Sequence, residues 1–270
     1  MDLLPKKQLF SCRGLGDNDS RSRKIHINLS NSLIKYKMSQ IPVVFIPGLL
    51  CDSLLWAPQI GTLSDIADCW IADPTGAETM EALAAELLDS SPFAEFALAG
   101  LSMGGYVALE IMRQAPGRVL KLALLDTNAR ADTSEQTQRR RALIDLAQHG
   151  RFAEVANLLL PALVNRARSY DPQIVGTIRA MARNVGIEAF CRQQSAIIRR
   201  IDSRPHLKAI QCPTLVLCGR QDAITPPPLH HELASGIDDA KLVIIEECGH
   251  LSTIEQPEEV NVALRAWLAT

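Results

Sequence analysis

Short apolar runs of five to seven residues recur along the chain, separated by turn-forming residues and longer amphipathic stretches. Runs of this length, bounded by Gly, Pro and Asp, predict buried β-strands. The strands between helical patterns predict right-handed βαβ units, and therefore an α/β fold with a mostly parallel, doubly wound sheet and helices on both faces. The predicted strands cover residues 43–48, 96–100, 120–126, 214–219 and 240–246, with a shorter candidate at 69–73, and the helical patterns include 80–90 and 106–119.

The alternation of strands and helices stops between residues 128 and 205, where the pattern is helical throughout. Ser134 or Asp132 marks the start of one helix, and Gly150 follows the end of one. A separate helix is predicted on each side of residues 185–186. A helical block inserted between two strands of a parallel sheet has no place on the sheet faces, so we expect it to form a cap over the carboxyl ends of the strands.

A length of 270 residues suits one large α/β domain with an inserted subdomain. The first 37 residues are polar and basic and have no regular hydrophobic period, so we expect them to be a disordered extension. Met38 is an alternative start, because the strand pattern begins directly after it. The predicted division is an extension over 1–37, an α/β core over 38–127 and 206–270, and a helical cap over 128–205.

Charge is unevenly distributed, although the net charge is only −2. The predicted cap holds thirteen Arg and no Lys against seven Asp and Glu, whereas the predicted core holds seven Lys and Arg against twenty Asp and Glu. The plainer interpretation is a basic cap docked on an acidic core, with most arginines on solvated faces. The alternative is that the cap attracts an anionic substrate or carrier into the cleft beneath it.

The cysteine and hydropathy patterns indicate the cellular compartment in which the protein is expected. No segment has the roughly eighteen uninterrupted apolar residues of a membrane span, and the amino terminus lacks the apolar centre of a secretory signal. Seven cysteines without a Cys-x-x-Cys pair favour reduced thiols over a disulfide framework. We therefore expect a cytoplasmic protein that acts on a small molecule and binds neither a membrane nor nucleic acid. A monomer and a homodimer both fit the sequence.

The stretch "FALAGLSMGGYVALEIM" (96–112) joins a buried strand, a serine between glycines and a helical pattern. Gly100, Gly104 and Gly105 remove the side chains that would crowd Ser102, and the surrounding residues fit the G-x-S-x-G nucleophile elbow. The motif alone arises often by chance, but here it has the strand before it and the helix after it that the elbow requires. Ser102 is therefore the candidate nucleophile.

A serine hydroxyl needs a positioned base, and that base needs an orienting group. In an open parallel sheet such groups gather beyond the carboxyl ends of the strands. Asp222 follows one predicted strand in the turn-rich loop "GRQDAITPPP", and His250 follows another in "CGHLSTIEQPEEV". These two residues are the candidates for the acid and the base.

The chain order Ser102, Asp222, His250 is the order found in α/β-hydrolases. With the elbow "GLSMGG", the acid loop "GRQDAITP" and the terminal "GHLSTIEQPEEV", residues 41–270 resemble the α/β-hydrolase superfamily with an inserted helical cap. The resemblance implies that Ser102 attacks a carbonyl carbon, His250 takes and returns the proton, and Asp222 orients His250. Some relatives place the acid at the position of Asp126, which is therefore the rival of Asp222.

The resemblance also implies an oxyanion hole made of two backbone N–H groups. Met103, which follows the candidate nucleophile, supplies one of them, and Leu49 supplies the other, with Leu50 as its alternative. Relatives usually carry His-Gly where this chain has Pro47-Gly48. The glycine that permits the turn is kept, so we expect the hole to be kept as well.

The leading hypothesis is a cofactor-independent serine hydrolase that cleaves a small carboxylic ester or lactone through an acyl-enzyme on Ser102. "SMGG" and "HLSTIEQPE" are similar to stretches in enol-lactonases but recur across esterases, so the substrate stays open. A thioesterase, a C–C bond hydrolase, a cofactor-free haloperoxidase and a non-catalytic ligand-binding module are the alternatives. Neither a cofactor nor a metal is expected: there is no phosphate-binding glycine loop, and His230 and His231 point apart on a predicted helix.

Overall fold

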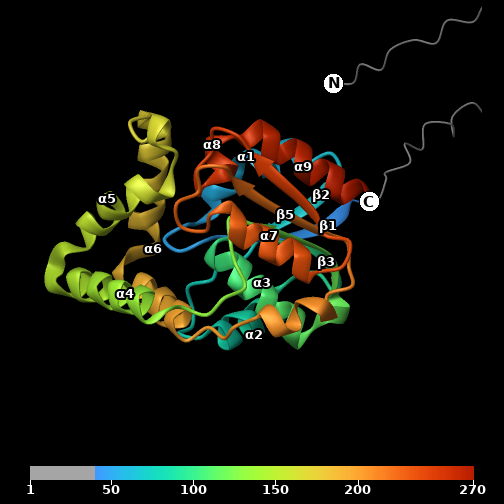
Figure 1. Cartoon of the computed structure of the whole chain (residues 1–270), viewed down its shortest axis with the longest axis horizontal. Coiled ribbons are helices and arrows are strands. Elements are labelled where there is room, and N and C mark those ends of the chain that lie inside the picture. Colours follow the sequence, from blue (N-terminus) through green and yellow to red (C-terminus); the bar gives the residue numbers. More distant parts are fainter. Residues whose placement is uncertain (1–39) are drawn as a thin grey trace, which may run out of the picture. The chain divides into compact units, whose positions relative to one another are not determined.

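Six parallel strands form one sheet in the order β2-β1-β3-β4-β5-β6 in the computed structural model, which describes residues 40–270 (Figure 1). From β1 the chain winds to one edge of the sheet at β2 and then returns to fill the other side, which confirms the doubly wound α/β fold. The predicted extension over residues 1–37 lies outside the described residues. The strands are β1 (Ile41–Ile46), β2 (Ala67–Ile71), β3 (Phe96–Leu101), β4 (Val119–Leu125), β5 (Thr214–Gly219) and β6 (Lys241–Ile245).

Side chains at successive positions of the central strands enter two different cores, because they alternate between the faces of the sheet. Val44 and Leu98 pack in the core beneath α2, α3 and α7, whereas Val43 and Ala97 pack in the core beneath α1 and α9. Both faces of the sheet are therefore buried under helices, as the continuous apolar strands predict. The covering helices are α1 (Ala57–Leu63), α2 (Met80–Ser90), α3 (Met103–Gln114), α7 (Pro227–Gly236) and α9 (Pro257–Ala269).

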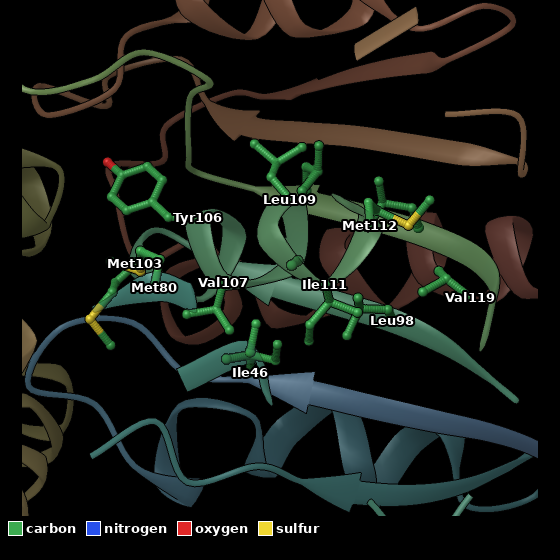
Figure 2. Packing of buried hydrophobic residues seen from close by; sticks show 14 of the residues in the cluster. Ile46, Met80, Leu98, Met103, Tyr106, Val107, Leu109, Ile111, Met112 and Val119 are labelled. Atoms are coloured by element: carbon green, nitrogen blue, oxygen red, sulfur yellow. The ribbon is translucent and has the colours of Figure 1, made fainter. Parts of the chain in front are cut away.

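Helix α3 is the most deeply buried of these helices: every residue from Met103 to Met112 is buried. Figure 2 shows Val107 and Ile111 of α3 beside Ile46 and Leu98 of the sheet, in the same apolar cluster. A helix that is buried along most of its length is held by packing on more than one side. The turn that leads into α3 is therefore fixed between the sheet and a packed helix.

Three helices lie between β4 and β5 in the sequence and outside the two helix layers of the sheet (Figure 1). The first begins at Ser134, one of the two predicted starts, after the N-cap Thr133, which forms a capping box with Gln136; the alternative start at Asp132 is wrong. The division of the chain into core and cap at residues 128 and 205 stays a prediction. The helices, here called the insertion, are α4 (Ser134–Leu146), α5 (Phe152–Leu163) and α6 (Pro172–Ile198).

Two glycines bend the insertion. Gly150 has a φ of 81° in the turn between α4 and α5, and Gly186 has a φ of 74° within α6, at the point where the sequence predicts two separate helices. A residue with a positive φ interrupts a helix, and glycine is the residue that adopts a positive φ without strain. The bends close the three helices around Phe190, in a small core that also receives Leu50 from the loop after β1. The insertion therefore packs directly on the loop after β1.

The predicted boundaries are wrong at a few places. The predicted helix over 106–119 begins at Met103 and ends at Gln114, because Pro116 to Arg118 form a 3-10 turn before β4. The edge strand β2 starts two residues earlier than the candidate at 69–73. In the part of the chain from residue 40 onward, no helix is both long and apolar enough to cross a membrane.

Gly104 supports a stability prediction. A Cβ at this position would lie 2.8 Å from the carbonyl carbon of Ile46 and against its oxygen, and a strand backbone cannot move aside. We expect Gly104→Ala to lower the free energy of unfolding by about 1–3 kcal/mol, measured by urea denaturation. The control is Gly117→Ala, because a Cβ there has no neighbour within 4 Å. Equal losses in both variants would contradict this account of the close approach.

Candidate active site

Ser102 stands in a strained turn between β3 and α3, with φ 55° and ψ −114°. The turn depends on Gly100, because a Cβ there would lie 2.8 Å from the backbone nitrogen of Gly105. Two bonds to the end of β4 hold the serine backbone: its N–H donates to the carbonyl of Leu125 (2.9 Å), and its carbonyl accepts from Thr127 Oγ1 (2.8 Å). Strain of this kind costs about 1–3 kcal/mol and persists only where the surroundings enforce it.

The structure brings Ser102, Asp222 and His250 together from three separate loops. His250 follows β6 and precedes the short helix α8 (Ser252–Glu255), and Asp222 follows β5. His250 Nε2 lies 2.8 Å from Ser102 Oγ, and His250 Nδ1 lies 2.8 Å from Asp222 Oδ2. A carboxylate opposite Nδ1 places the proton on that nitrogen, which leaves the Nε2 lone pair free to accept the serine proton.

Asp222 is fixed by more than the histidine. Its Oδ1 accepts the N–H groups of Ile224 (2.8 Å) and Thr225 (2.9 Å), and its Oδ2 accepts the Thr225 hydroxyl (2.7 Å). Burial by itself raises the pKa of Asp222, but the charge and hydrogen bond of His250 and the donors of Thr225 outweigh it and lower the pKa below its usual value. Asp222 is therefore a carboxylate with its lone pairs already engaged.

The pKa of His250 is shifted in the opposite direction. Burial by itself lowers it, but the charge and hydrogen bond of Asp222 raise the pKa above its usual value, with smaller contributions from Asp126 and Glu255. The protonated imidazolium is thus stabilised by the buried carboxylate at its other nitrogen. An imidazole of this kind accepts a proton more readily than a free one.

The rival acid, Asp126, makes no hydrogen bond to His250. Its Oδ1 accepts a hydrogen bond from the N–H of Gly219 (3.1 Å). Its Oδ2 accepts hydrogen bonds from the N–H of Ser252 (3.2 Å) and from the Ser252 hydroxyl. Burial and the charge of Asp222 raise the pKa of Asp126 well above its usual value. Through these hydrogen bonds Asp126 ties the ends of β4 and β5 to the residues after His250.

Hydrogen bonds to the insertion hold the backbone around His250 in place. The N–H groups of His250 and Leu251 both donate to the carbonyl of Leu163, at the end of α5, at 3.1 Å each. The buried Glu255 accepts the N–H of Gly249 at 3.1 Å and that of Leu251 at 3.3 Å with the same oxygen. Burial raises the pKa of Glu255, despite these donors. The imidazole is thus positioned by the sheet from one side and by the insertion from the other.

Leu49 and Leu50, in the loop after β1, differ in whether the backbone N–H is engaged. The N–H of Leu50 donates to Gln193 Oε1 on α6 at 3.1 Å, so it is engaged. Within residues 40–270 the N–H groups of Leu49 and Met103 have no acceptor. A Cβ on Gly48 would lie 3.4 Å from the Ser102 Cβ, which places this loop against the serine. Of the two alternatives for the oxyanion donor, Leu49 is the one whose N–H is available.

A cavity of about 400 Å³ contains Ser102 and His250, a size within the usual range for small-molecule sites. Its floor comes from the strand ends, and its walls come from the insertion, mostly as apolar side chains. The insertion residues in the wall include Leu143, Leu159, Ile178 and Met181, and the polar ones are Gln136, Arg139, Arg140 and Gln194.

The other candidate histidines are placed elsewhere. His230 is buried, and its Nε2 accepts the N–H of Thr127 at 2.9 Å, whereas the neighbouring His231 is exposed. Burial lowers the pKa of His230 to about 4, so it stays neutral and acts as an acceptor for the Thr127 backbone. Among residues 40–270 no cluster of three or more His, Cys, Asp or Glu side chains is arranged to hold a metal ion.

Three residues at this site escape the sequence analysis: Thr225, Gln193 and Glu255. A signal for Thr225 is present, because a hydroxyl three residues after an aspartate commonly closes a turn on it. No sequence signal marks Gln193 or Glu255, since each is identified only by the backbone N–H groups that it accepts, that of Leu50 for Gln193 and those of Gly249 and Leu251 for Glu255.

Comparison with known proteins gives a consistent set of relatives. Residues 43–263 match a family described as the alpha/beta hydrolase family. The solved structure of an esterase from Thermogutta terrifontis, with malate bound, is 32% identical, has a TM-score of 0.78 and covers 85% of this chain and 89% of its own. That of the enol-lactonase from Burkholderia xenovorans LB400 is 26% identical, with a TM-score of 0.78 and coverage of 86% and 92%. A protein of Mycobacterium tuberculosis named "Putative non-heme bromoperoxidase BpoC" is 29% identical over 197 residues, which are 72% of this chain and 75% of BpoC.

The two buried aspartates allow a matched test of which one carries charge beside the histidine. Asp222→Asn removes the carboxylate that raises the pKa of His250, so we expect that pKa to fall, measured by NMR titration of the imidazole signals. Asp126 makes no hydrogen bond to His250 and contributes less to that shift, so Asp126→Asn should lower the pKa of His250 less. An equal fall in both variants would show that the negative charge is shared by the pair.

Proposed function

The chain belongs to the alpha/beta hydrolase family, and from that premise we propose that it cleaves small carboxylic esters or lactones, without a cofactor, through an acyl-enzyme on Ser102. The relatives support a hydrolase. The observation that carries the finer proposal is the chain of hydrogen bonds from Asp222 through His250 to Ser102, at 2.8 Å in each step. Nucleophile, base and orienting acid are within reach of one another before any substrate binds.

In the first half of the proposed reaction, Ser102 Oγ attacks the carbonyl carbon while His250 Nε2 takes the hydroxyl proton. The carbonyl oxygen becomes negative, and the N–H groups of Leu49 and Met103 donate to it. As the tetrahedral intermediate collapses, the bond to the leaving alcohol breaks and His250 returns the proton to that alcohol. For a lactone the same bond breaks, and the alcohol stays attached to the acyl group.

In the second half, a water molecule attacks the acyl carbon and gives its proton to His250. The second intermediate collapses, the bond to Ser102 Oγ breaks, and His250 returns the proton to the serine. The product is a carboxylic acid. Through both halves Asp222 stays ionised and stabilises the imidazolium, which fits its lowered pKa and its engaged lone pairs.

The relatives and the cavity support the choice of substrate class. The esterase and the enol-lactonase named above both act on acyl–oxygen bonds, and each covers most of this chain. The mostly apolar cavity of about 400 Å³ suits a small acyl group. Thioesters and C–C bonds are alternatives within the same acyl-transfer chemistry.

BpoC supplies a reason to test a second function, a cofactor-free haloperoxidase. Bromination that depends on both peroxide and bromide, and that exceeds ester hydrolysis under the same conditions, would favour this second function. The non-catalytic binding module is the weaker alternative, because a ligand-binding pocket does not need a serine, a histidine and an aspartate in hydrogen-bond contact.

Labelling of Ser102 tests the proposal directly. A fluorophosphonate reacts only with an activated serine, so we expect one adduct per chain by intact mass, mapped to the peptide that contains Ser102. Ser102→Ala should take no label and should lose at least about 10³-fold in kcat on a panel of esters, lactones and thioesters. Ser64→Ala, which changes an exposed serine outside the cavity, is the control. A folded wild-type protein that takes no label would refute the acyl-enzyme mechanism.

A further inference from the structure

We propose that the insertion side of the cavity is a subsite for a carboxylate, so that the substrate is an ester or lactone whose acyl part ends in a second, ionised carboxyl group. The inference rests on the proposed function, because it concerns the substrate of the same serine. It is carried by the side chains that line the cavity opposite Ser102 and His250.

One face of α4 supplies the first part of the subsite. Gln136, Arg139, Arg140 and Leu143 are spaced at intervals of three and four residues, so they lie on one side of the helix, and all four line the cavity. Two cations therefore border the cavity from one element. Among the described residues that line it there is no Asp or Glu to neutralise them.

Gln194 on α6 supplies an unpaired donor. Arg140 Nη1 donates to Gln194 Oε1 at 2.9 Å, and since a guanidinium only donates, the amide must present its oxygen to Arg140. The other atom of the amide is then Nε2, which has no acceptor within residues 40–270, although the side chain is fully buried. A buried donor without an acceptor is costly, and Gln194 lines the cavity. A ligand oxygen would satisfy it.

Arg140 is held in place and keeps part of its charge. Its Nε donates to the buried carboxylate of Asp132 at 2.7 Å, and Asp132 also pairs with Arg200. One carboxylate shared by two guanidinium groups leaves one positive charge on the cluster. Because both partners fix it, Arg140 is preorganised for a ligand rather than free to turn into solvent.

Arg139 is the second cation of the subsite. Within residues 40–270 its exposed side chain borders the cavity and makes no hydrogen bond and no ion pair. Two arginines of the insertion that do not line the cavity are paired on the surface, Arg151 with Glu154 and Arg168 with Asp171. The plainer interpretation of the basic cap fits these two, whereas the anionic-substrate interpretation fits the two at the cavity.

The chemistry of the lining selects the class of ligand. Arg139, Arg140 and Gln194 Nε2 all donate, and a carboxylate only accepts, in a planar geometry that guanidinium groups match. An apolar tail of the same size would leave the Gln194 donor unpaired, and a neutral polar tail could pair with that donor but would gain no charge attraction from the two cations. The rest of the wall is apolar and suits the methylene chain between the two ends of such a substrate.

The test compares two substrates of equal size. One is the monophenyl ester of adipic acid, whose far end is a carboxylate, and the other is its neutral counterpart with a terminal carboxamide. Release of phenol gives kcat/KM for each, and the ratio of the anionic to the neutral value measures the preference. We expect the wild-type ratio to exceed about ten, since one well-placed ionic contact is commonly worth that factor.

Arg139→Gln and Arg141→Gln form a matched pair. They remove the same charge from the same helix, but Arg141 is exposed and does not line the cavity. We expect the ratio to fall about five- to tenfold in Arg139→Gln and to keep its wild-type value in Arg141→Gln. Gln194→Glu adds a carboxylate in place of the donor, so it should lower the ratio further, provided that its unfolding midpoint matches the wild type.

Three results would overturn the subsite. A wild-type ratio near one would show that the cavity does not select a carboxylate, while hydrolysis of the neutral ester would leave the proposed function intact. Equal falls in Arg139→Gln and Arg141→Gln would show long-range attraction in place of a local contact. A protein that cleaves neither ester and takes no fluorophosphonate would refute the proposed function, and the subsite with it.

Discussion

The close approach of α3 to the sheet is the constraint on which the other features depend. Because Gly100 and Gly104 have no side chains, the helix starts against the backbone of β1 and β3, and the residue between them is forced into a left-handed conformation. That conformation lifts the serine hydroxyl out of the sheet toward His250. With any side chain at either glycine, the helix would move outward and the hydroxyl would lose its alignment.

Around the imidazole, three buried carboxyl groups have three different tasks that follow from their surroundings. Asp222 accepts hydrogen bonds from Ile224, Thr225 and the imidazole, and its pKa is lowered, whereas Asp126 joins the ends of β4 and β5 to Ser252 and its pKa is raised. Glu255 binds the backbone on both sides of His250. Residue type alone does not distinguish these roles, since burial, neighbouring charge and hydrogen-bond partners decide what a carboxyl group does.

Much of this arrangement is predictable from the sequence, for physical reasons. Buried parallel strands are short and apolar, and the elbow needs glycines at fixed offsets, so the sheet and Ser102 can be located from local pattern. Asp222 and His250 follow from their positions after strands. The choice between Leu49 and Leu50, by contrast, depends on Gln193, which lies 143 residues away in the chain. The N-cap of α4 at Thr133 shows the same limit at short range, because the adjacent Asp132 and Ser134 are also acceptable caps.

The hydrogen bonds from His250 and Leu251 to the carbonyl of Leu163 have a consequence for how the cavity opens. Any motion that lifts the end of α5 takes the acceptor away from the histidine loop, so an insertion that swung open as one rigid piece would dismantle the base with each opening. A motion of α4 about the turn at Gly150 would leave that acceptor in place, so the histidine loop constrains the movement of α5 more than that of α4.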